Sequence, residues 1–349
     1  MMNFIIKFFF ILKNANLFLY LKLIKVLVIR DFSKYPSYLF KFQELLKSYF
    51  KIKYCLTFSS GSAAFYAALK SFNFGPSPSV LISRMTFPSV YAILKKEGYK
   101  IFIYEVDDNF QPIISKNLSK IKFELLIVTH PYGFFVDWRY LKKKLNNKIK
   151  IIFDLSHAHG GKFKKKQLSN FADISFLSIQ GSKAISGGEG GIILTNNIKY
   201  YKNMINSHHP GYPNNYFKNI AGLCEDIKLR IHPLAALIAT DDIYKLDKRN
   251  SKNINKFNQI YKYLSNYPGI FQIPDYKKFL IGGFHFGLPF FSEKKIFKNY
   301  PFLKYNWLIK YDFERVKIIT RLNKLYFIDL NFIKLNPFYI IKKKINEIL

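Results

Sequence analysis

The sequence predicts an α/β protein whose main sheet is mostly parallel and is covered by helices on both faces, which gives three layers. Short apolar runs of strand length recur between positions 54 and 195, and helix-like stretches lie between several of them. Continuous apolar strands that alternate with helices are typical of parallel sheets buried on both sides. With 349 residues, 49% of them hydrophobic, the chain is long enough for a second, smaller domain.

The expected elements follow from the spacing of apolar residues. A helix is expected over 40–50, and a strand over 54–58 leads through a Ser-Ser-Gly-Ser turn into a helix over 63–72. The further strands expected cover 80–82, 101–106, 125–129, 149–153, 174–178 and 192–195. Helices are expected among them over 89–98 and 138–145.

A long helical pattern over 230–264 predicts a helix that links a large domain to a small one. We therefore expect three parts. They are an N-terminal extension over 1–30, a large domain over 31–245 that contains the candidate site segments described below, and a small C-terminal α/β domain over 246–349. The last part mixes short β-like runs with helical ones.

The chain is strongly basic, because 55 lysines and arginines face 22 acidic residues and give a formal net charge of +33. Such an excess can indicate nucleic acid, anionic lipid or phosphorylated substrates. No nucleic-acid recognition motif stands out and the lysines are spread along the chain, so we predict no nucleic-acid partner. The two cysteines, Cys55 and Cys224, form neither a disulfide framework nor a metal-ligand spacing, which favours a cytoplasmic location.

The first thirty residues are apolar and basic, with 22 apolar, five basic and no acidic residues. No charge-free window approaches the about 18 residues that a spanning helix needs, and no signal-peptide cleavage pattern is present. Several polar positions share one stripe of a helical wheel. One interpretation is a helix at the surface of an anionic membrane, and the other is an extra helix packed on the protein.

The first candidate site segment is SSGSAA at 59–64, between a strand and a helix. Glycine lets the backbone approach a ligand closely, and the first N–H groups of a helix have no partner within it. That arrangement suits a phosphate. A simple helix cap is the alternative interpretation, since serine is a good N-cap residue.

The second segment is FDLSHAHG at 153–160. Asp154 follows an apolar strand, so its carboxylate is expected at the edge of the sheet where ligands bind. A carboxylate there can keep a heterocyclic nitrogen protonated, as pyridoxal phosphate (PLP) requires, although a turn aspartate is the alternative. His157 and His159 would share a face on a strand, but no third metal ligand is recognisable and we predict no metal site.

The third segment is SIQGSKAISGGEGG at 178–191, in which Lys183 stands five residues beyond the strand-end Ser178. A lysine that acts as a nucleophile on a carbonyl needs a confined site that perturbs its ammonium group. The glycines that follow would let the backbone fold closely around such a site. The alternative is a flexible surface loop.

In order and spacing, these segments resemble the DegT/StrS sugar aminotransferase family of PLP enzymes, which has the aspartate aminotransferase fold (type I). The resemblance extends over roughly residues 42–250. Each segment alone has a purely structural explanation, whereas the joint pattern is specific and favours function. The matching residues are Ser60-Gly61-Ser62-Ala63, Thr86-Phe87, His130-Pro131-Tyr132-Gly133, Asp154 with His157-Ala158, Ser178 with Lys183, and Gly188-Glu189-Gly190-Gly191.

The resemblance implies roles for eight of the matching residues. Lys183 forms a Schiff base with PLP and later moves a proton between the substrate carbon and the cofactor, and Asp154 pairs with the pyridine nitrogen. The remaining cofactor contacts implied are stacking by Phe87, contact of His157 with the phenolic oxygen, and phosphate binding by Gly61, Ser62, Ala63 and Ser178.

The resemblance also implies an activity and partners. Members transfer an amino group, mostly from glutamate, to a nucleotide-linked keto sugar and form homodimers. The sugar dehydratases of the family carry histidine in place of the lysine, so Lys183 argues against that branch. The alternative from another class is a protein that keeps the PLP fold without turnover and acts in regulation or assembly.

Three departures from the family pattern stand out. Lys228-Leu229-Arg230-Ile231 stands where the family usually has Asn-Tyr-Arg-Met, whose asparagine reaches the phosphate of the partner subunit. A lysine is a point charge with a different geometry. The region after Leu264 carries little family pattern, so the sequence predicts neither the sugar nor the carbon that is aminated. The apolar extension over 1–30 lies outside the usual family plan.

Overall fold

The computed structural model of the chain describes residues 35–145, 148–208, 228–275 and 287–292, the strands at 303–305 and 325–329, and single helical positions near both ends. The predicted extension over 1–30 lies outside the described residues, apart from Leu21 and Ile24, which are helical and exposed. In the part of the chain that is described, no helix is long and apolar enough to cross a membrane.

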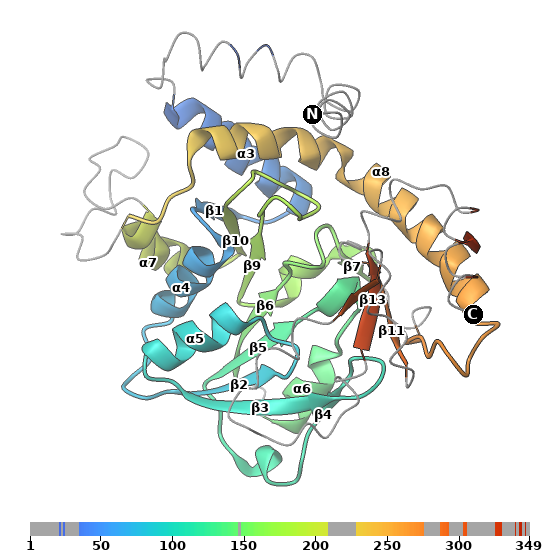
Figure 1. Cartoon of the computed structure of the whole chain (residues 1–349). Coiled ribbons are helices and arrows are strands. Elements are labelled where there is room, and N and C mark those ends of the chain that lie inside the picture. Colours follow the sequence, from blue (N-terminus) through green and yellow to red (C-terminus); the bar gives the residue numbers. More distant parts are fainter. Residues whose placement is uncertain are drawn as a thin grey trace.

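An eight-stranded sheet forms the centre of the molecule (Figure 1), in the order β1-β10-β9-β6-β5-β2-β3-β4. The five strands from β9 to β3 run parallel, while β10 is antiparallel to β1 and β9, and β4 is antiparallel to β3. The predicted, mostly parallel sheet is confirmed. The strands are β1 (Tyr54–Phe58), β2 (Ser79–Ser83), β3 (Lys100–Val106), β4 (Pro112–Ile113), β5 (Leu125–Thr129), β6 (Lys150–Asp154), β9 (Ile174–Ser178) and β10 (Gly191–Thr195).

Helices cover both faces of this sheet, so that the predicted three layers are present. Alternate side chains of a strand point to opposite faces, and in β2 Leu81 packs into one core while Val80 and Ile82 pack into the other. One core contains buried residues of α3, α6 and α8, and the other contains those of α4, α5 and α7. The helices are α3 (Tyr35–Phe50), α4 (Gly61–Ser71), α5 (Pro88–Lys96), α6 (Trp138–Lys144), α7 (Ile198–His208) and α8 (Pro233–Leu264).

The element boundaries differ from the predicted ones by a few residues, for local reasons. Helix α4 begins at Gly61 because the side chain of Ser60 caps it by accepting from the Ala63 N–H at 3.0 Å. Asp154 is the last residue of β6 and does not follow the strand, because its backbone still pairs with Thr129. Helix α8 begins at Pro233, since residues 228–231 lie instead along the end of β1.

Several elements had no sequence prediction. They are the hairpin β7 (Lys162–Phe163) and β8 (Lys166–Gln167), strand β4, helix α7 and the 3₁₀ turns η1 (Leu118–Lys120), η2 (Pro131–Gly133) and η3 (Leu168–Phe171). The three strands have two residues each, which is too few to show an apolar period.

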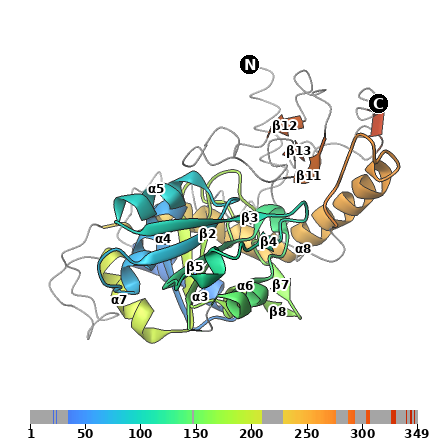
Figure 2. The same cartoon turned by 90° about the horizontal axis from the view of Figure 1, so that it is seen from below.

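A second sheet follows α8 along the chain. It is antiparallel, in the order β11-β13-β12, and lies beside the far half of α8, away from α4 and α7 (Figures 1 and 2). Its strands are β11 (Gly287–Phe291), β12 (Leu303–Tyr305) and β13 (Leu325–Asp329). Phe290 of β11 packs into the core that contains the buried residues of α3, α6 and α8. Helix α8 continues through residues 245 and 246, so the domain boundary placed there stays a prediction.

Candidate active site

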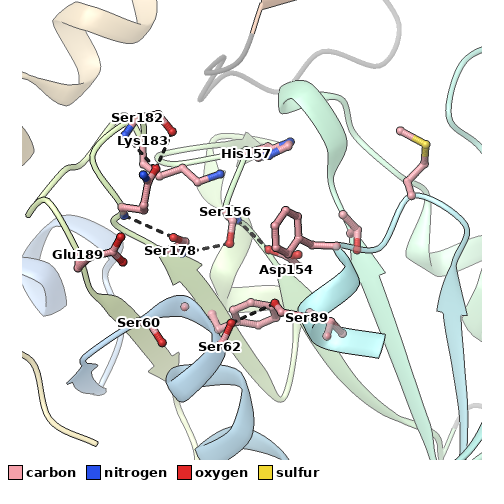
Figure 3. Close-up of a pocket in the computed structure, with 17 residues that line it drawn as sticks. Ser60, Ser62, Ser89, Asp154, Ser156, His157, Ser178, Ser182, Lys183 and Glu189 are labelled. Atoms are coloured by element: carbon pink, nitrogen blue, oxygen red, sulfur yellow. Dashed lines mark hydrogen bonds between the residues drawn. The ribbon is translucent and has the colours of Figure 1, made fainter. Parts of the chain in front are cut away.

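A pocket of about 410 Å³ lies where the carboxyl ends of the central strands meet the N-terminus of α4 (Figure 3). Its wall is built from the turn after β1, the turn before α5, the end of β6 and the loop after β9. Ligands bind at this edge of parallel sheets because the loops there converge. The predicted site residues that line the pocket are Gly61, Ser62, Phe87, Asp154, His157, Ser178 and Lys183.

Ala63 is the predicted phosphate contact that the pocket does not include. Its backbone N–H donates to the Oγ of Ser60 at 3.0 Å, so the cap of α4 uses this donor. The N–H groups of Gly61 and Ser62 precede it in the first turn, where a helix supplies no partner. Those two positions therefore remain the predicted backbone contacts of a phosphate.

The turn that contains Gly61 lies directly against the end of β9. A methyl group at this position would stand 2.8 Å from Cβ of Ser178, so only glycine fits without movement. Ser62 donates from Oγ to Oγ of Ser89 at 3.0 Å. The hydroxyl groups of Ser62 in α4, Ser89 in α5 and Ser178 in β9 thus lie near the start of α4. They give an anion several hydrogen-bond donors beside a helix N-terminus.

Asp154 places a buried carboxylate on the pocket wall at the end of β6. Only 5% of the residue is exposed, and Oδ1 accepts from the Ser156 N–H at 3.0 Å. Burial raises the pKa of this carboxyl, while the hydrogen bond from Ser156 and the charge of Lys183 act in the opposite direction. A carboxylate in this position gains most from a cationic partner in the cavity.

Lys183 reaches from its loop into the pocket, with Asp154 on the other side of the cavity (Figure 3). Burial lowers the pKa of its amine to about 8, and the charge of Asp154 offsets part of that decrease. The loop is closed at its base, because the Gly181 N–H donates to the Gly188 carbonyl at 2.8 Å. Gly188 has a φ of +83°, a conformation that glycine adopts without strain.

His157 lies on the pocket wall as a neutral imidazole. Burial lowers its pKa well below the ordinary value, and the nearby Lys183 lowers it further. Its Nδ1 accepts from the Tyr132 N–H at 3.3 Å, so we assign the proton to Nε2. Tyr132 presents that N–H from a left-handed conformation (φ 54°) in the turn after β5. Nε2 can then donate to an anionic oxygen in the cavity.

The pocket also contains polar residues that sequence reasoning did not assign. Thr129 ends β5, and its Oγ1 lies 3.3 Å from Oγ1 of Thr86. Ser156 accepts from the Ser178 N–H at 3.0 Å and thereby joins the ends of β6 and β9. Their position at strand ends was a usable signal, since such residues converge at one edge of the sheet. The other polar lining residues that had no predicted role are Ser60, Ser89, Gln180, Ser182 and Glu189.

The sequence of residues 22–285 matches the family model of the DegT/DnrJ/EryC1/StrS aminotransferase family. The chain belongs to this family. The matched range contains every described residue that lines the pocket, and it confirms the predicted resemblance. No group of three or more His, Cys, Asp or Glu side chains that could hold a metal ion occurs among the described residues of this family member.

Curated relatives of this aminotransferase-family chain are about a quarter identical to it over the aligned residues. GDP-perosamine synthase of Escherichia coli O157:H7 is 27% identical over 243 residues, which are 65% of each protein. The 3-amino-5-hydroxybenzoate synthase of Amycolatopsis mediterranei is 23% identical over 205 residues, which are 56% of this chain and 52% of that protein. The chain thus spans less than two thirds of the length of these relatives.

Solved structures confirm the predicted PLP-dependent transferase fold. PseC of Helicobacter pylori, an aminotransferase involved in the biosynthesis of pseudoaminic acid, superposes with a TM-score of 0.75 at 16% identity, over 89% of this chain and 91% of that one. The E. coli GDP-4-keto-6-deoxy-D-mannose-3-dehydratase with bound hydrated PLP gives a TM-score of 0.64 at 15% identity, over 74% and 72% of the two chains.

Proposed function

We propose that this chain is a PLP-dependent aminotransferase that transfers an amino group to the keto group of a nucleotide-linked sugar. One observation carries most of the proposal: Lys183, Asp154 and the turn at Gly61 line a single cavity. Membership of an aminotransferase family supports the same activity.

The residues of the pocket fit PLP at each of its functional groups. The first turn of α4 and the hydroxyls of Ser62 and Ser178 suit the phosphate. Asp154 suits the protonated ring nitrogen. Phe87, half exposed and lining the pocket, is placed to stack on a planar ring, and His157 can donate to the ring oxygen.

When bound, PLP supplies an aldehyde that condenses with amines and a ring that withdraws electrons from the substrate carbon. The protein supplies a group that moves a proton and a charge beside the ring nitrogen. With a pKa of about 8, Lys183 keeps about a tenth of its amine neutral at pH 7, so Nζ can take up a proton and return it. The Asp154 carboxylate holds a proton on the ring nitrogen by its charge.

The relatives support the proposed substrates. Their names include GDP-perosamine synthase, which indicates a nucleotide-linked sugar as the amino acceptor. A solved structure of the related dehydratase carries a trapped PLP–glutamate geminal diamine, which supports glutamate as the amino donor. The net charge of +33 favours a phosphorylated substrate. We further propose a homodimer and a cytoplasmic location.

The experiment is to purify the protein with PLP, record its visible absorbance, add glutamate, and repeat both steps with Lys183→Ala. We expect an absorption band that depends on Lys183 and that glutamate bleaches. If PLP binds but no amino donor changes the spectrum, the protein keeps the fold without turnover. If PLP does not bind at all, the cofactor assignment is wrong.

A further inference from the structure

Two side chains of α8 hold the backbone that follows Lys183. Arg249 donates from Nη1 to the Ala184 carbonyl, and Asp242 accepts from the Ser186 N–H at 2.8 Å through Oδ2. The two side chains also join each other, because Nη2 of Arg249 donates to Oδ1 of Asp242. The two positions are seven residues apart, about two helical turns, so both side chains leave the same face of α8. We call this pair the Asp242–Arg249 clamp.

The surroundings of the clamp make its hydrogen bonds stronger than those of an exposed ion pair. The Arg249 and Asp242 side chains are 27% and 22% exposed, and hydrogen bonds to charged groups gain strength where water is partly excluded. The loop also lies close to α8. A methyl group on Gly187 would stand 2.7 Å from the Ala235 carbonyl oxygen, so the backbone has no room to shift toward the helix.

A third side chain, from the loop after β6, binds the same loop. His159, fully buried, accepts at Nδ1 from the Ile185 N–H at 3.1 Å. The Ala184 carbonyl, the Ile185 N–H and the Ser186 N–H are therefore all bound by side chains. These side chains come from helix α8 and from the loop after β6. An ordinary glycine-rich surface loop has no need of such restraint.

We propose that Arg249 and Asp242 are positioning residues, which fix the loop so that the amine of Lys183 stays inside the pocket. The inference rests on the function proposed for Lys183. A lysine side chain has four flexible bonds, so its amine is placed only as well as the backbone that carries it. The clamp supplies this restraint without touching the pocket.

The direct test measures hydrogen exchange in the full chain without cofactor, over peptides that contain residues 183–187. Asp242→Ala and Arg249→Met each remove bonds to charged groups, and we expect exchange of this loop to become about tenfold faster. The matched controls are Asp241→Ala and Lys245→Met, which break a neighbouring ion pair of α8. In both controls we expect the loop to exchange at the wild-type rate.

A second readout is the reactivity of Lys183 itself, labelled by acetic anhydride at a series of pH values. The ionisable groups near this amine are Asp154, His157, His159 and Glu189, and none of them is changed in the variants. Burial lowers the amine pKa to about 8, so release of the loop should move the labelling midpoint upward. The controls should keep the wild-type midpoint.

The outcomes test the positioning role of the clamp separately from the proposed aminotransferase function, because neither readout requires bound PLP. Unchanged exchange and an unchanged labelling midpoint in both clamp variants would show that the pair does not position Lys183. Should Asp242→Ala fail to fold, Asp242→Asn keeps the size and removes the charge, and a smaller increase in exchange is expected. Faster exchange throughout the chain, with no preference for the loop, would show a role in global stability and would overturn the proposal.

Discussion

At the scale of single residues, the same burial acts in opposite directions on the two ionisable groups of the pocket. It lowers the pKa of Lys183 and raises that of Asp154, because a low-dielectric site disfavours either charge. Each group partly offsets the shift of the other. A cationic ring nitrogen in the cavity would stabilise the ionised carboxylate and leave Lys183 free to be neutral.

Asp154→Asn tests the carboxylate at nearly constant size. We expect PLP to bind about thirtyfold more weakly, since a hydrogen bond to a charged group contributes about 2 kcal/mol. Equilibrium titration with PLP measures the change. Asp173→Asn is the control, because Asp173 precedes β9 at the other end of the strands and pairs with Lys150. Equal losses in both variants would contradict a specific role for Asp154.

The lowered pKa of Lys183 predicts the pH dependence of cofactor attachment. Below its pKa the amine is protonated and cannot attack an aldehyde, so the rate of attachment should rise with pH and level off above about 8. Stopped-flow absorbance with PLP over this pH range gives the profile. A rate that keeps rising toward the ordinary lysine pKa of 10.5 would mean that the amine is not buried.

At the scale of elements, the site depends on two backbone segments that meet at the strand ends. The turn between β1 and α4 touches the end of β9, although the two are more than a hundred residues apart in sequence. Strand β10 lies between β1 and β9 in the sheet and fixes this distance by its pairing with both. The order of the strands thus brings together the two segments that we propose bind the phosphate.

Gly61→Ala should push the turn at the start of α4 away from the end of β9. The added methyl group would stand 2.8 Å from Cβ of Ser178, and overpacking of this kind costs about 1–3 kcal/mol. We expect affinity for PLP to fall about tenfold, while affinity for pyridoxal, which lacks the phosphate, stays the same. Gly75→Ala is the control, because nothing lies within 4 Å of a methyl group there. Equal losses for PLP and pyridoxal would show that the turn does not bind phosphate.

At the scale of the whole molecule, every described residue that lines the pocket comes from positions 60 to 189, within the large sheet and its loops. Helix α8 acts from outside this range, by packing along α3 and by gripping the lysine loop. We propose that the apolar, basic residues 1–30 contact an anionic membrane surface.

Deletion of residues 1–30 should abolish binding to anionic vesicles. It should leave the affinity for PLP unchanged, because the described lining of the pocket comes from positions 60 to 189. PLP titration and co-sedimentation with vesicles of anionic or zwitterionic lipid measure the two properties, and the full-length chain is the reference. Loss of PLP binding in the truncated chain would show that the extension supports the pocket. Retained vesicle binding would assign the membrane contact to another surface of this basic protein.

The sequence by itself determined the longer strands of the large sheet and several of the residues that line the pocket. The apolar runs at 54–58, 125–129 and 174–178 coincide with β1, β5 and β9, because continuous burial demands continuous apolar character. Asp154, Ser178 and Lys183, which line the pocket, were recognisable because ligand-binding residues lie at or just beyond the ends of strands. These are properties of short segments, and short segments are what periodicity and motif spacing report.

Only the tertiary structure decided which groups are engaged and what holds them. It showed that the Ser60 side chain takes the N–H of Ala63, and that β10 runs antiparallel between β1 and β9. It also revealed the Asp242–Arg249 clamp, whose partners lie about sixty residues away along the chain. Hydrogen bonds between distant segments depend on how the layers pack, and a polar contact between two such segments leaves no periodic pattern in the sequence of either.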